Sequence, residues 1–162
     1  MRDNFELDRT DISILKVLQQ DATTSIDAIA EQVSVSPNTC WRRIKRMEDN
    51  KIILGRVILI EPKAIGAGQI VFVSVRTREH NSEWASRFQK IASEIPEVIE
   101  IYRLAGDVDY LLKIACRDVA EYDRVYNRLI NKIDLTDVSA AFAMECLKHT
   151  TALPLKTDSG LV

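Results

Sequence analysis

The sequence predicts an α+β protein with an N-terminal winged helix-turn-helix and a C-terminal ferredoxin-like βαββαβ sandwich. Three observations support this prediction. Apolar residues recur at helical spacing behind cap residues in the first third, and strand and helix patterns alternate after residue 70. Three of the five glycines lie between Gly55 and Gly68, which indicates a boundary there. We therefore expect one domain over residues 1–60, a linker over 61–69 and a second domain over 70–162.

Composition indicates a folded protein outside the membrane. Of the 162 residues, 46% are apolar and 28% are charged, as in ordinary globular domains. No apolar run approaches the roughly 18 residues that a membrane span needs. The first residues include Asp3 and Glu6 and lack the apolar core of a secretion signal. We expect a cytoplasmic protein with no membrane partner.

Cap residues predict the starts of three helices in the first domain. Asp8, Ser25 and Ser36 are good N-caps, and Pro37 suits the first helical position because its missing N–H costs no bond there. The apolar run 52–60 then predicts a short hairpin or a single strand. The three helical stripes are Ile12, Leu15 and Leu18, then Ile26, Ile29, Ala30 and Val33, then Cys40, Ile44 and Met47.

The second domain reads as strand, helix, strand, strand, helix, strand. Strands are predicted at 70–75, 98–104 and 110–116, and a long last strand alternates from Val138 to Cys146. This order is that of a split βαβ sandwich. The two helical stripes between the strands are Trp84, Phe88, Ile91, Ala92 and Ile95, and Tyr122, Val125, Tyr126, Leu129, Ile130 and Ile133.

Positive charge is concentrated on the third helix although the chain has a net charge of −2. Residues 42–56 contain six basic and two acidic residues, a local charge of +4. Two short helices, the second of them basic, are typical of a helix-turn-helix that reads double-stranded DNA, here over about residues 25–47. A solvated helix face or a small packing module would show the same pattern. The candidate DNA contacts are Ser36, Asn38, Thr39, Trp41, Arg42, Arg43 and Arg46.

Each residue type in this set suits a DNA contact. Arginine can grip guanine with both of its nitrogens, asparagine can do the same for adenine, and either can hold a phosphate. Trp41 has two interpretations, because it could pack at the helix edge or lie against the sugar–phosphate backbone.

The cysteines predict neither a metal site nor a disulfide framework. Cys40, Cys116 and Cys146 are odd in number and far apart, no CxxC pair occurs, and the histidines are His80 and His149. We expect buried, reduced thiols.

Catalysis is the competing class of function. The sequence has no visible nucleophile–base pair, no GxSxG and no glycine-rich phosphate loop, so we expect neither an enzyme nor a bound cofactor. A protein that organises DNA with little sequence preference is a third class, which binding to specific and random duplexes would distinguish.

Several segments resemble the leucine-responsive/asparagine regulator (Lrp/AsnC) family over nearly the whole chain. They are LDRTDI at 7–12, VSPNTCWRRI at 35–44, GDVDYLLK at 106–113 and LKHTT at 147–151. The resemblance implies a sequence-specific transcriptional regulator that responds to a small effector, commonly an amino acid. It also implies homodimers that assemble into tetramers or octamers.

The resemblance places the effector at the loop between the two middle strands of the second domain. There a carboxylate could pair with an α-ammonium group while loop amides hold an α-carboxylate. The residues alone also allow the aspartates to cap the turn or to bind a cation. The implied effector residues are Ala105, Gly106, Asp107, Asp109 and Tyr110.

Two positions depart from the family pattern. Lys51 stands where the family usually has glycine, so Asn50 or Lys51 must adopt the left-handed cap conformation. Ala140 stands where the family often has a hydroxyl, and the neighbouring Ser139 points to the other face of the strand. The second departure leaves the usual effector contact open.

Overall fold

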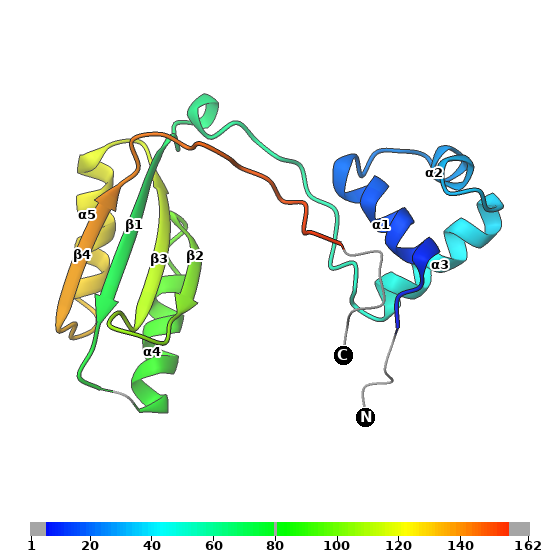
Figure 1. Cartoon of the computed structure of the whole chain (residues 1–162). Coiled ribbons are helices and arrows are strands. Elements are labelled where there is room, and N and C mark those ends of the chain that lie inside the picture. The colour runs from blue at the N-terminus through cyan, green and yellow to red at the C-terminus, as the bar shows by residue number, and fades with distance from the viewer. Residues whose placement is uncertain (1–5, 80, 156–162) are drawn as a thin grey trace. The chain divides into compact units, whose positions relative to one another are not determined.

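The computed structural model describes residues 6–79 and 81–155, which form two compact units. The first unit contains three helices and the second a sheet with two helices (Figure 1). The division falls between Ile58 and Leu59, and the described tail from Lys148 onward belongs with the first unit. The sequence placed this tail in the second domain. The difference arises because Leu155 packs against the core of the first unit.

The first unit has the predicted caps. Helix α1 spans Arg9–Gln20, α2 spans Ile26–Gln32 and α3 spans Pro37–Asp49. Asp8 forms a capping box with Asp11, and Ser25 and Ser36 each accept a hydrogen bond from the third helical residue. The predicted stripes form the core only in part, because Ile12 and Leu18 are half-buried whereas Ile14 is buried. The buried apolar residues are Ile14, Leu15, Ile29, Ala30, Cys40, Ile44 and Met47.

The chain leaves α3 through a left-handed residue and then runs without a strand. Of Asn50 and Lys51, the two residues predicted to adopt the left-handed conformation, Lys51 does so with φ +59°. Ser34, in the turn before α3, is also left-handed with φ +56°. The hairpin or strand predicted over Ile52–Ile60 is wrong, since the structure assigns none to these residues. A strand needs a partner for its amides and carbonyls, and no described residue of this chain pairs with the segment. A short 3₁₀ helix follows at Pro62–Ile65.

The second unit has the predicted βαββαβ order of elements. Its elements are β1 Gln69–Arg76, α4 Ser82–Ser93, β2 Val98–Arg103, β3 Tyr110–Cys116, α5 Val119–Ile130 and β4 Asp137–Phe142. The strands lie in the order β2-β3-β1-β4, and every neighbouring pair is antiparallel.

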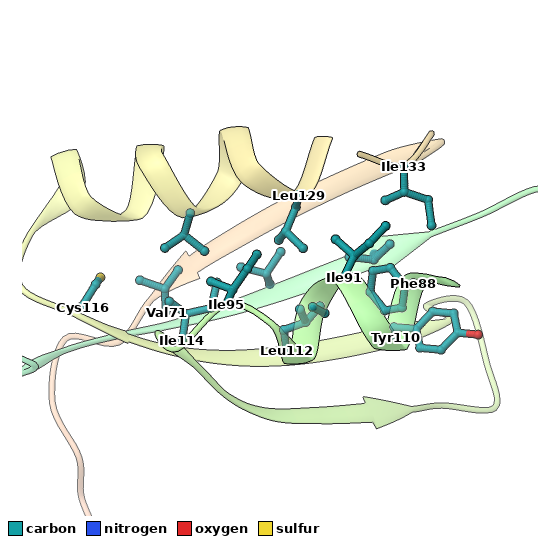
Figure 2. Packing of buried hydrophobic residues seen from close by; sticks show 14 of the residues in the cluster. Val71, Phe88, Ile91, Ile95, Tyr110, Leu112, Ile114, Cys116, Leu129 and Ile133 are labelled. Atoms are coloured by element: carbon teal, nitrogen blue, oxygen red, sulfur yellow. The ribbon is translucent and has the colours of Figure 1, made fainter. Parts of the chain in front are cut away.

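The core of the second unit lies between the sheet and its two helices (Figure 2). Alternate residues of β1 and β3 point into it, as the burial of Val71, Val73 and Val75 shows. Phe88 of α4 lies 4.7 Å from the Tyr110 ring and 5.2 Å from Trp84, measured between centroids. No helix in residues 6–79 or 81–155 has the length and apolar character needed to cross a membrane.

The last strand is shorter than the sequence predicts. β4 ends at Phe142, and Met144 beyond it is 96% exposed. The strand ends here because its partner β1 begins at Gln69. The last backbone hydrogen bond between the two strands runs from the Ala143 amide to the Ile70 carbonyl at 2.9 Å. The expected burial of all three cysteines is therefore wrong for Cys146, which is exposed.

The thiols should differ in reactivity, because burial raises the pKa of Cys40 and of Cys116. We expect a maleimide reagent at neutral pH to modify Cys146 in the folded protein, and the other two only after unfolding. Mass spectrometry of the labelled peptides measures this directly. Rapid labelling of Cys40 in the native protein would contradict the burial of α3 against α1.

Candidate nucleic-acid interface and effector loop

The burial of one face of α3 determines which side chains its opposite face presents. Cys40, Ile44 and Met47 are buried, so the residues opposite them are those at Asn38, Arg42 and Lys45. All three side chains are exposed and lie at i, i+4 and i+7, along one ridge of the helix. Lys45 is not among the predicted contacts, although its helical spacing from Asn38 could have indicated it.

Two of the candidate arginines are instead bound to α1. The Asp11 carboxylate is fully buried, and it accepts hydrogen bonds from Arg43 Nη1 at 2.8 Å and from Arg46 Nη2 at 2.8 Å. Arg43 Nη1 also donates to Asp8 Oδ2 at 2.6 Å. A buried carboxylate needs such partners because desolvation of an unpaired charge is very costly. These contacts connect the start of α1 to the middle of α3.

Arg43 is therefore half-buried, with 24% of its side chain exposed, rather than on the outer face. Arg46 keeps 49% of its side chain exposed while it holds Asp11. Although partial burial opposes it, the Asp11 amide and the Arg43 guanidinium lower the pKa of Asp8 below its ordinary value. Asp8 thus stays ionised and keeps its contact with Arg43 over the physiological range.

The remaining candidates lie at the start of α3. The Ser36 hydroxyl accepts from the Thr39 amide at 3.2 Å and donates to the Thr39 hydroxyl at 2.8 Å, so this pair fixes the first turn. Trp41 is 53% exposed, so the structure does not bury its ring against the helix edge, the first of the two interpretations. The contact with a sugar–phosphate backbone stays a prediction.

Ion pairs neutralise most of the basic segment. Lys45 lies 2.9 Å from Asp49, and Arg56 lies 3.5 Å from Glu48. Within residues 6–79 and 81–155, Arg42 takes part in no ion pair, and neither does Lys51. Arg42 is thus the basic side chain of this face that is most available to a phosphate or a base.

The loop between β2 and β3 exposes three of the five residues predicted to bind an effector. Ala105, Gly106 and Asp107 are exposed. Gly106 has φ +149°, a conformation that favours glycine, and a Cβ built there would meet nothing within 4 Å. The loop is therefore open at this position, and a substitution at Gly106 would be disfavoured by backbone strain rather than by crowding.

The other two predicted effector residues are occupied within the fold. Asp109 donates from its amide to the Val75 carbonyl at 3.1 Å, and its Oδ2 accepts from the Thr77 amide at 2.8 Å. Tyr110 is buried against Phe88. Asp109 thus caps the turn and ties it to the end of β1, one of the alternatives that the sequence left open.

The sheet places Ser139 and Ala140 on opposite faces of β4. Ala140 is paired with Val73 and Ser139 with Ser74, so the hydroxyl lies on the other face of β4, as expected. In the described part of the chain, no group of three or more His, Cys, Asp or Glu side chains could hold a metal ion.

Comparison with family models matches both units. Residues 7–48 match the AsnC-type helix-turn-helix domain, and residues 70–153 match the Lrp/AsnC ligand binding domain. These two segments cover most of the chain.

Characterised relatives match over nearly the full length. The glutamate uptake regulatory protein of Zymomonas mobilis is 50% identical over 154 residues, which are 95% of this chain and 94% of the relative. The DNA-binding transcriptional activator DecR of Escherichia coli is 44% identical over 151 residues, 93% of this chain and 99% of the relative.

Solved structures agree with the fold. An AsnC family transcriptional regulator from Agrobacterium tumefaciens has a TM-score of 0.89 at 49% identity and covers 92% of this chain and 97% of its own. A transcriptional regulator from Neisseria meningitidis in complex with L-Met has a TM-score of 0.87 at 32% identity, with coverage of 93% and 97%.

Loss of the Asp11 charge should destabilise the first unit. Asp11→Asn removes the buried acceptor of two charge-assisted hydrogen bonds, and a hydrogen bond to a charged group contributes about 1.5–3 kcal/mol, so we expect the free energy of unfolding to fall by an amount of that order. Asp49→Asn is the matched control, because it breaks the exposed pair with Lys45, worth about 0–1 kcal/mol. Urea unfolding measures the free energy of unfolding of both variants, and hydrogen exchange of the α1 and α3 amides measures the stability of these two helices. Equal effects of the two variants would contradict the role given to Asp11.

Proposed function

The chain belongs to the Lrp/AsnC family of transcriptional regulators, and on that basis we propose that it binds a specific double-stranded DNA sequence through α3 and that an amino acid bound at the Gly106 loop alters this binding. The observation that carries the first part is the exposed ridge of Asn38, Arg42 and Lys45. A helix with polar and basic residues near its N-terminal end is what the major groove accepts.

Within this proposal the arginines of α3 have different roles. Arg42 contacts DNA directly, with Asn38, Lys45 and the edge of Trp41 beside it. Arg43 holds α3 in position through Asp8 and Asp11. Arg46 shares Asp11 with Arg43 and keeps half of its side chain in solvent, which suits a phosphate contact as well.

Specific binding by so small a helix requires more than one copy of the chain. One recognition helix reaches only a few base pairs, so a dimer that spans two half-sites about one helical turn apart gives useful specificity. Two apolar surfaces support a homodimer. Val57 and Ile58 are 80% and 89% exposed, and Phe72 and Tyr102 are 39% and 49% exposed on the sheet. A second copy that covers them would remove apolar area from water. Assembly into tetramers or octamers is part of the same proposal.

An amino acid is the effector class that this loop suits. Asp107 is an exposed carboxylate that can pair with an α-ammonium group, and the open backbone at Gly106 leaves room for an α-carboxylate at the loop amides. The complex of the Neisseria relative with L-Met supports the same class. The ligand changes DNA binding only if it favours one assembly state over another.

Arg42→Ala should weaken DNA binding more than the loss of a basic residue elsewhere in the chain. For duplexes that the wild-type chain selects from a random pool, we expect a loss of about 1–3 kcal/mol if Arg42 reads a base. If it holds a phosphate, binding falls evenly across sequences and the salt slope decreases by about one. Lys90→Ala on α4 is the control, and salt-matched gel shifts are the measurement. Wild-type affinity of Arg42→Ala for every duplex would refute the assignment of this ridge.

The effector response should depend on Asp107. Calorimetric titration with each of the twenty amino acids in turn should identify at least one that binds the wild-type chain. Binding of that amino acid should change the free energy of DNA binding by roughly 1–3 kcal/mol. Asp107→Ala and Gly106→Asp should abolish that response and leave the circular dichroism spectrum unchanged. Asp134→Ala, an exposed aspartate elsewhere in this unit, is the control. An amino acid that binds both loop variants with unchanged affinity would place the site elsewhere.

A further inference from the structure

The described end of the chain packs against the helices of the first unit. Gln19, in the last turn of α1, accepts a hydrogen bond from the Leu153 amide at 2.7 Å and donates from Nε2 to the Leu153 carbonyl at 3.3 Å. One side chain thereby satisfies both backbone groups of a residue that is 134 positions away. Leu155 is half-buried and packs against the core of the helices.

The same segment begins at the sheet of the second unit. The Ala143 amide donates to the Ile70 carbonyl at 2.9 Å, and the Gln69 side chain donates to the Ala143 carbonyl at 3.3 Å. Ala143 is therefore fixed to β1, and Leu153 is fixed to α1. The segment between Ala143 and Leu153 is therefore bonded to the second unit at its start and to the first unit at its end.

We infer that residues 143–155 form a second tether, which docks on α1 and limits how far the first unit can move from the second. Chain length supplies the argument. The ten residue-to-residue steps from Ala143 to Leu153 span at most about 35 Å when fully extended. The linker from Ile53, the last core residue after α3, to Gln69 covers sixteen residue-to-residue steps and could span about 55 Å when fully extended. The docked tail is thus the shorter of the two connections, and it sets the maximum separation of the two units.

A shorter tether matters for DNA binding because two recognition helices must reach two half-sites together. Restricting the volume that each can search raises their effective concentration at the correct spacing and excludes other spacings. This step rests on the proposed function, whereas the tether itself does not.

Gln19→Ala tests the tether, and the adjacent Gln20→Ala is the matched control because Gln20 is exposed on the same helix. In Gln19→Ala we expect the Leu153 amide to exchange hydrogen at least tenfold faster and the maximum dimension from small-angle X-ray scattering to increase. Gln20→Ala should match the wild type in both. A chain that ends at Ala152 removes the docked residues without changing α1 and should behave as Gln19→Ala does.

Two results would overturn the inference. One is unchanged exchange at Leu153 in Gln19→Ala, which would mean that the contact is not made. The other is an unchanged scattering profile once the tail is released or removed, which would mean that the tail does not limit movement.

A DNA-binding experiment distinguishes failure of this inference from failure of the proposed function. With duplexes selected by the wild-type chain, inserting half a helical turn between half-sites should reduce wild-type binding at least tenfold, and binding of Gln19→Ala by less than threefold. If the wild-type chain selects no sequence, the proposed function fails, and the scattering comparison still decides the tether.

Discussion

The buried carboxylate of Asp11 is the interaction on which the first unit depends. Its side chain is fully buried and is neutralised by Arg43 and Arg46 of the third helix. Because a buried carboxylate without cationic partners is strongly destabilising, α1 and α3 are held in one relative orientation. The capping box with Asp8 fixes the start of α1 in the same cluster. With the apolar side of α3 buried and Arg43 held at its flank, only one face of the helix remains for a ligand.

Neighbouring residues of one type therefore have different roles. Arg42 and Arg43 are adjacent, but successive residues of a helix are about 100° apart around its axis. That rotation places Arg42 opposite the buried stripe and Arg43 beside α1. The aspartates of the Gly106 loop are divided in the same way, since Asp107 is exposed and Asp109 bonds to Thr77. In both places the residue nearer to a second element stabilises the fold, and the other remains available.

The features that the sequence predicted correctly are those that local patterns determine. Caps at Asp8 and Ser36 need only the next few residues, and the alternation within β3 depends on its own sequence. The errors concern distant partners. The end of β4 depends on where β1 begins, and the segment after α3 forms no strand because no described part of this chain pairs with it. The ion pairs of Arg43 join residues 32 and 35 positions apart, which composition cannot indicate.

The register of the sheet bears on how a ligand could act at a distance. Val75 pairs with Tyr110 beside the Gly106 loop, whereas Val71 pairs with Phe142 at the other end of β1. Both connections to the first unit leave from that other end, because the linker enters at Gln69 and the tail departs after Phe142. The two ends of β1 are separated by roughly 20 Å of strand. A ligand at the loop therefore reaches neither connection of its own chain directly. If the proposed function holds, this arrangement favours a response through the packing of one copy against another, where a loop at the edge of the unit can make or break a contact.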